Sequence, residues 1–197
     1  MRRIPLLAAA AALISTTQTV AAQPPVIVEA RGGYTFPTSG DWNESGYYEN
    51  GSGAGLTVTA MVRSQSGVYV GWESFRFPAD QELPGVDERS YSTDTGFRVG
   101  LASFIPLAAI PAVTPFTELG LVYNTFEISL TDADTVRTIE ADPSLGYEAG
   151  VGATIRMMSL LEVAPTFRYR QHKVDFEDGR SETVGYFALG VGLRMRL

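Results

Sequence analysis

Residues 186–197 read Tyr-Phe-Ala-Leu-Gly-Val-Gly-Leu-Arg-Met-Arg-Leu. The odd-numbered positions from Phe187 to Leu197 are all apolar, whereas the even-numbered positions from Tyr186 to Arg196 carry tyrosine, alanine, glycine and arginine. Successive side chains of a strand point to opposite faces. This period of two therefore predicts a β-strand with one apolar and one polar face.

The same alternation recurs along the chain, and helical spacing is nearly absent. It is clearest at 145–157, where apolar residues alternate with glycines and with Glu148, Thr154 and Arg156. The remaining stretches with this pattern are 26–36, 56–63, 68–75, 97–102, 118–124 and 166–170. Together they predict an all-β chain of eight strands.

Long and short connections between these strands mostly alternate along the chain. The long ones are polar or acidic and cover 38–52, 78–89 and 131–143, with 177–182 as the last connection. The short ones cover 64–67, 105–113 and 158–162. Such a succession is typical of an antiparallel up-and-down transmembrane β-barrel, with long loops outside and short turns on the periplasmic side. The apolar, proline-rich link 105–113 is expected to pack against the barrel rim.

The first 22 residues have the pattern of a cleaved secretory signal peptide. Arg2 and Arg3 precede an apolar run from Ile4 to Ile14, and small residues end the segment at Ala22. The run is too short for a helix to span a bilayer. We therefore expect residues 23–197 to form one exported barrel domain.

Composition excludes several classes of function. The chain of 197 residues has no cysteine, one histidine and a formal charge of −7. Disulfides, cysteine-bound metals and a multi-histidine centre are therefore excluded. A nucleic-acid partner would need a basic face. We expect no cofactor, no metal and no nucleic acid.

Three features predict that the polar face lines the lumen and the apolar face meets lipid. The polar face is rich in glycine, which a narrow lumen needs and a solvated strand does not. Aromatic residues gather near strand ends, as membrane girdles do: Tyr34, Phe36, Phe77, Tyr91, Phe126, Phe176 and Phe187 at the loop side, Phe104 and Phe116 at the turn side. The polar face also carries charges of both signs, which predict a charge network in the lumen: Glu29, Arg31, Arg63, Glu73, Arg98, Glu118, Glu148, Arg156, Arg168, Arg170, Arg194 and Arg196.

The signal segment, the eight alternating strands and the final Gly192-Leu-Arg-Met-Arg-Leu197 resemble the small Gram-negative outer-membrane β-barrels of the OmpA-like, porin-like type. In that family the last strand commonly ends in phenylalanine, whereas this chain ends in Leu197 and keeps the apolar alternate positions. The resemblance implies an outer-membrane location, contact with outer-membrane lipid and lipopolysaccharide, and a monomer. It also implies recognition of the last strand by the barrel-assembly machinery.

The interior of eight strands is just filled by side chains. We therefore expect a structural or surface-exposed role, with a charged and largely plugged lumen. A small diffusion porin and a soluble secreted ligand-binding barrel, its apolar face inward, are the alternatives. The acidic loops would form a solvated surface or bind divalent cations.

An enzyme is not expected. Outer-membrane lipid A deacylases, which share this architecture, use a His-x-Ser pair. The single histidine, His172, is followed by Lys173 and Val174, so the serine is missing. We expect His172 to be a polar residue at the rim.

Overall fold

The computed structural model describes residues 25–39, 49–79, 90–132, 135–177 and 179–197. The expected signal peptide at 1–22, and most of the acidic loops at 38–52 and 78–89, lie outside these residues. The strands are β1 (Val26–Ser39), β2 (Gly51–Arg63), β3 (Ser66–Pro78), β4 (Tyr91–Phe104), β5 (Val113–Asp132), β6 (Thr135–Asp142), β7 (Ser144–Arg156), β8 (Leu161–Phe176) and β9 (Ser181–Arg196).

Helices contribute no candidate membrane span in the part of the chain described here.

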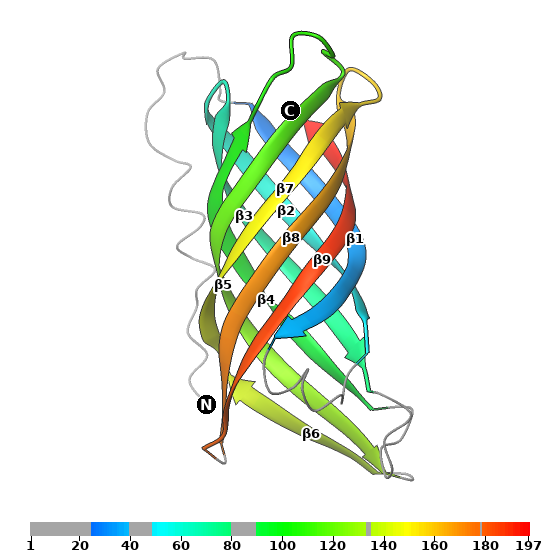
Figure 1. Cartoon of the computed structure of the whole chain (residues 1–197), viewed down its shortest axis with the longest axis vertical. Helices are drawn as coiled ribbons and strands as arrows, with labels where there is room; N and C mark the ends of the chain where they lie inside the picture. The colour runs from blue at the N-terminus through cyan, green and yellow to red at the C-terminus, as the bar shows by residue number, and fades with distance from the viewer. Residues whose placement is uncertain (1–24, 40–48, 80–89, 133–134, 178) are drawn as a thin grey trace.

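Eight of these strands form a closed antiparallel ring (Figure 1). Neighbours along the chain pair from β1 to β5, then β5 pairs with β7, β7 with β8 and β8 with β9. The ring closes where β9 pairs with β1. The predicted eight-stranded up-and-down barrel is confirmed, and closure leaves no open strand edge within the ring.

The register determines how strongly the strands tilt. A line drawn across paired residues from Val26 of β1 returns to β1 at Phe36, ten residues higher. A shear of ten over eight strands corresponds to a tilt of about 40°. The ten steps along the strand from Val26 to Phe36 then rise by about 25 Å, the height of a lipid-facing band.

The polar face of each strand lies inside the barrel. On β9, Leu189, Val191 and Leu193 are more than half exposed, whereas Gly190 and Arg194 are buried. A soluble barrel would place its apolar face inward. The alternative of a soluble ligand-binding barrel is therefore wrong, and the apolar outer wall is that of a transmembrane barrel.

The connection predicted at 131–143 is not a simple loop. It forms a hairpin of the C-terminal end of β5, from Glu127 to Asp132, with β6, and this hairpin projects beyond the ring at the bottom of Figure 1. Its acidic residues suggested a loop, but its threonines, Val136 and Ile139 favour a strand. Only Pro143 separates β6 from β7. Since β5 pairs Asn124 with Ser144 and Glu127 with Glu140, one extra residue bulges there.

Candidate functional site

The most distinctive chemistry of the molecule is a network of ion pairs across the middle of the lumen. Alternation along the strands turns each of its side chains inward, and none of them is more than 5% exposed. The glutamates come from β1, β3, β5 and β7, and the arginines from β1, β4, β8 and β9. The members are Glu29, Glu73, Glu118 and Glu148, with Arg31, Arg98, Arg168, Arg170 and Arg194.

Arg98 of β4 joins three strands through one guanidinium group. Its Nε donates to Glu148 at 2.7 Å, its Nη1 to Glu73 at 3.2 Å and its Nη2 to Glu118 at 2.7 Å. The same group lies 4.4 Å from the ring centre of Tyr69, whose hydroxyl donates to Glu148 at 2.8 Å. The planar guanidinium offers five donors, which suits it to this crowded position.

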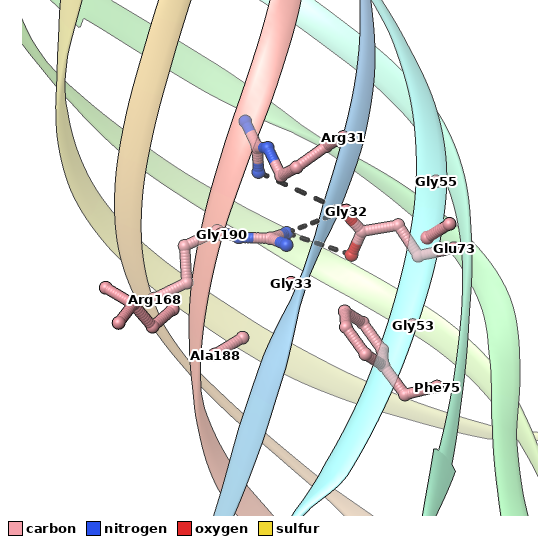
Figure 2. A pocket seen from close by; sticks show the side chains of 12 residues that line it. Arg31, Gly32, Gly33, Gly53, Gly55, Glu73, Phe75, Arg168, Ala188 and Gly190 are labelled. Atoms are coloured by element: carbon pink, nitrogen blue, oxygen red, sulfur yellow. Dashed lines mark hydrogen bonds and ion pairs between the residues drawn. The ribbon is translucent and has the colours of Figure 1, made fainter.

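Glu73 of β3 gathers arginines from the opposite wall. Arg168 lies 2.8 Å and Arg170 lies 2.6 Å from its carboxylate oxygens. Arg170 also donates to Glu148 at 2.9 Å. Figure 2 shows Arg31 and Arg168 directed towards Glu73, with Arg31 the more distant at 3.9 Å. Glu73 therefore holds β3 to β8 across the lumen.

The periplasmic half of the network is centred on Glu29. Arg31 and Arg194 each lie 2.5 Å from one of its two carboxylate oxygens. Arg194 also donates to the Thr154 hydroxyl at 3.0 Å, and its guanidinium lies 4.0 Å from the ring centre of Phe116. Each of these charges thus has a partner in a place that excludes water.

Asp94 also belongs to the buried charges of the lumen, although it was not among the charges predicted from the sequence. Its carboxylate accepts hydrogen bonds from Asn124 at 2.6 Å and from the Tyr186 hydroxyl at 2.7 Å. Arg170 in turn donates to that hydroxyl at 3.2 Å. With Asp94 and Glu162, six carboxylates and five arginines are buried in the described lumen, and Glu162 lies at its periplasmic end beside the partly exposed Arg196. Extending the strand 97–102 by a few residues would have placed Asp94 on the inward face.

The prediction that His172 lies at the rim is wrong. The residue is 3% exposed, and its Nε2 lies 3.7 Å from Asp94 in the lumen. It pairs with Gly146 across β7 and β8, so it continues the inward face that carries Arg168 and Arg170.

Three arginines predicted for the network lie outside it. Arg63 and Arg156 are exposed at the ends of β2 and β7. Arg196 is partly exposed, and it lies 3.4 Å from Glu162. Arg156 and Arg196 have the inward parity but come at the periplasmic rim. The register of β2 against β3 shifts between Met61 and Arg63, so Arg63 pairs with the outward Ser66 and lies on the outer face. Alternation indicates the face of a residue and not its depth.

The glycines of the inner face make room for these long side chains. A Cβ at Gly120 would collide with the Tyr69 hydroxyl. At Gly150 it would lie 2.5 Å from Cγ of Arg168, and at Gly192 it would overlap Glu29. The glycines and the large side chains of the inner face are therefore complementary, between adjacent strands for Gly150 and Gly192 and across β4 for Gly120.

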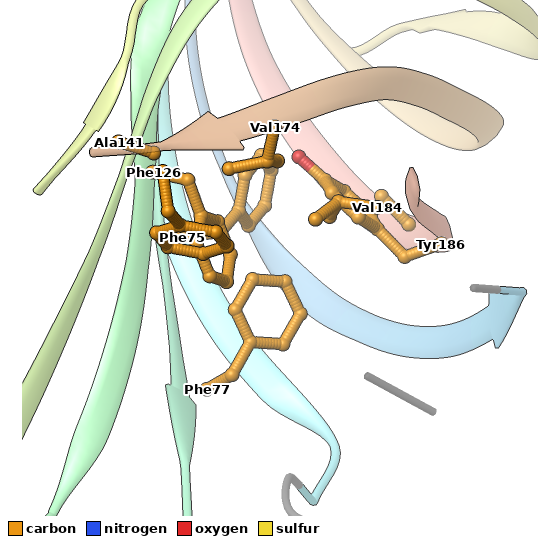
Figure 3. Close-up of a cluster of buried hydrophobic side chains, with 9 residues drawn as sticks. Phe75, Phe77, Phe126, Ala141, Val174, Val184 and Tyr186 are labelled. Carbon is orange, nitrogen blue, oxygen red and sulfur yellow. The ribbon is translucent and has the colours of Figure 1, made fainter. Parts of the chain in front are cut away.

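Apolar clusters fill the lumen on both sides of the network. At the loop end, Phe75, Phe77, Phe126, Phe176 and Tyr186 pack with smaller residues (Figure 3). The cluster at the turn end contains Ile27, Met61, Tyr69, Ala102, Phe104, Phe116 and Ala164. In the described lumen, the cavity beside Arg31, Glu73 and Phe75 has a volume of about 10 Å³, which is room for about one water molecule.

The positions of these clusters show that part of the predicted aromatic girdles was wrong. Phe77, Phe126, Phe176, Phe104 and Phe116 are buried in the lumen and do not face lipid. The aromatic belt is formed instead by outward residues at one level, near the loop end of the barrel. Trp72, Phe97 and Tyr123 are neighbours across β3, β4 and β5. Its other members are Tyr34, Phe36, Tyr147, Tyr169 and Phe187.

No protein-family model matches the chain, and no curated protein sequence matches it. Solved structures do match. Neisserial surface protein A is 13% identical with a TM-score of 0.60, covering 87% of this chain and 97% of its own. The outer membrane protein OprG from Pseudomonas aeruginosa is 12% identical with a TM-score of 0.56, covering 87% and 96%.

A third match is the outer membrane protein AlkL in lipid bilayers, which is 12% identical with a TM-score of 0.56 and covers 93% of this chain and 95% of that one. The fold is that of the small outer-membrane β-barrels. Together with the apolar outer wall and the aromatic belt, this fold identifies an outer-membrane protein whose lumen carries buried charges.

Proposed function

We propose that the protein is a structural or surface-exposed outer-membrane barrel with a sealed lumen. The observation that carries this proposal is the filling of the lumen along its length. The ion-pair network occupies the middle, and an apolar cluster occupies each end.

Passage of an ion or a small solute would have to part this network. Arg98, Glu73 and Glu148 lie against partners on opposite walls, where water is excluded. Removing one partner from such a pair leaves an uncompensated buried charge, at a cost of about 3–5 kcal/mol. This cost disfavours the small diffusion porin.

Conductance across a planar lipid bilayer tests the proposal. The refolded wild-type barrel should give no steady conductance above that of the protein-free bilayer. The double variant Arg98→Ser/Glu148→Ser removes one charge of each sign from the middle of the lumen, and it should give brief or stable open levels. Stable open levels in the wild type would favour the porin and contradict a sealed lumen.

The partners follow from the outer surface. The belt of outward aromatic residues supports contact with outer-membrane lipid and lipopolysaccharide. The outward Leu189, Val191 and Leu193 of β9 support recognition by the barrel-assembly machinery. We further propose that the protein acts as a monomer.

We propose no catalytic role. The one histidine, His172, is buried in the sealed lumen, and Val174 stands where the His-x-Ser pair would need a serine. A surface role would rest on the β5–β6 hairpin, which reaches beyond the ring and exposes Val136.

A further inference from the structure

A groove crosses the outer wall of the barrel at its periplasmic end. It is an open groove of about 430 Å³ formed by β2, β3, β4 and β5. Its lining includes Val62, Arg63, Ser66, Val68, Leu101, Ser103, Thr117 and Leu119. It lies on the lipid side of the wall and is separate from the lumen.

The floor of the groove is apolar and belongs to the lipid-facing band. Val68, Leu101 and Leu119 are direct neighbours across three strands. Their exposed fractions are 40%, 65% and 64%, and that of Val62 is 69%. Since this surface continues the membrane-facing wall, an acyl chain is the occupant that its chemistry fits.

The periplasmic end of the groove is polar. Three hydroxyl groups form a row across β3, β4 and β5, namely those of Ser66, Ser103 and Thr117. The row lies two residues nearer the periplasmic end than Val68, Leu101 and Leu119. The outward positions near the same end of the other strands are apolar, namely Val26, Ile155, Val163 and Met195. Hydroxyl groups facing hydrocarbon are costly unless they meet polar partners. Their row therefore indicates the level of a lipid headgroup.

Arg63 adds a positive charge to this polar end. It pairs with Ser66 in the β2–β3 register and is exposed. Within the described part of the chain no carboxylate forms an ion pair with it. Arg156 and Arg196 also lie at this rim, against Glu162. The periplasmic rim is therefore basic, which favours an anionic headgroup.

We propose that this groove binds an anionic phospholipid of the inner leaflet of the outer membrane. One acyl chain lies along Val62, Val68, Leu101 and Leu119. The phosphate accepts hydrogen bonds from the Arg63 guanidinium and from the hydroxyl row, an arrangement that suits arginine. The inference rests on the proposed insertion of the barrel in the outer membrane.

Native mass spectrometry tests the site with defined lipids. The folded barrel is held in detergent micelles that contain either phosphatidylglycerol or phosphatidylethanolamine, and the retained lipid is counted. Wild type should retain phosphatidylglycerol in preference. Arg63→Gln should reduce this retention about tenfold, the loss of one strong charge-assisted hydrogen bond. Arg156→Gln removes a rim charge outside the groove and should retain lipid as wild type does.

A second variant, Ser103→Ala/Thr117→Val, should also reduce retention, because it removes two hydroxyl groups without changing the charge. Equal retention of both lipids, equal loss in the two arginine variants, or displacement of the lipid by inorganic phosphate would each overturn the site. All variants are checked for a heat-dependent gel mobility, which reports a closed barrel. A wild-type chain without that mobility shift would count against the proposed function and not against the groove.

Discussion

At the scale of single residues, the lumen depends on side chains that each meet several partners. Arg98 donates to three carboxylates, and Glu148 accepts from Arg98, Arg170 and Tyr69. A buried ion pair that loses one member is destabilised far more than an exposed pair, because the remaining charge stays away from water. The network therefore predicts that single substitutions of its members lower the stability of the barrel strongly, without any ligand being involved.

Glu148→Ala should lower the thermal stability of the barrel in detergent, since it leaves Arg98 and Arg170 each without one partner. The expected loss is about 3–5 kcal/mol. The measurement is the temperature at which the unboiled gel band disappears. Glu140→Ala, at an exposed position of β6, is the control and should leave that temperature unchanged. Equal melting of both variants and wild type would count against a buried network.

Gly120→Val should displace the Tyr69 ring, because a Cβ at that position collides with the Tyr69 hydroxyl. We expect a loss of about 1–3 kcal/mol, the usual cost of overpacking. Gly32→Val is the matched control, since its Cβ would face lipid and meet nothing nearer than 3.9 Å. The prediction fails if both valine variants melt alike.

Alternation was enough to place the nine core charges on the inward face, because the period of two is a property of the backbone. It was not enough to give depth. Arg156 and Arg196 have the inward parity but lie at the rim, and a register shift after Met61 places Arg63 on the outer face. Phe104 and Phe126 were expected in girdles because they lie near strand ends, yet they continue the inward parity of Arg98 and Glu118. Extending the parity to the full strand length would have placed them in the lumen.

At the scale of elements, the strands are longer than their regular sequence patterns. β8 extends from Leu161 to Phe176, although the alternation is clear only at 166–170. The β5–β6 hairpin was missed for a related reason. Its threonines and acidic residues are typical of a loop. They form strands because the C-terminal end of β5 pairs with β6 beyond the loop end of the ring. Which glutamate pairs with which arginine depends also on the shear of the barrel, and the local sequence does not encode that shear.

Replacing residues 130–137 by an Asn-Gly turn should leave the barrel closed. The pairs that close the ring between β5 and β7 run from Asn124–Ser144 down to Val113–Ile155, below the hairpin. Ile128 and Ile139, which pack against the upper apolar cluster, are retained in this variant. Far-ultraviolet circular dichroism and an unboiled gel band should match those of wild type. A chain that no longer folds would show that the hairpin is needed for closure.

At the scale of the whole molecule, the membrane-spanning ring reverses the usual arrangement of a soluble protein. Charged side chains lie inside the ring, and aliphatic side chains lie on its outer face. This arrangement is stable only where lipid surrounds the wall. The aromatic belt lies near the loop end, and the basic rim and the groove lie at the other end. The two ends of the molecule therefore meet different leaflets with different side chains.

In the arrangement described here, the apolar face of the strands meets lipid and the charged face lies within a closed ring. The most direct test is the gel mobility of the chain in the washed outer-membrane fraction, compared between boiled and unboiled samples. We predict from this arrangement that the protein stays with the membrane and migrates differently when it is not boiled. A protein that washes off the membrane, with one mobility under both conditions, would contradict it.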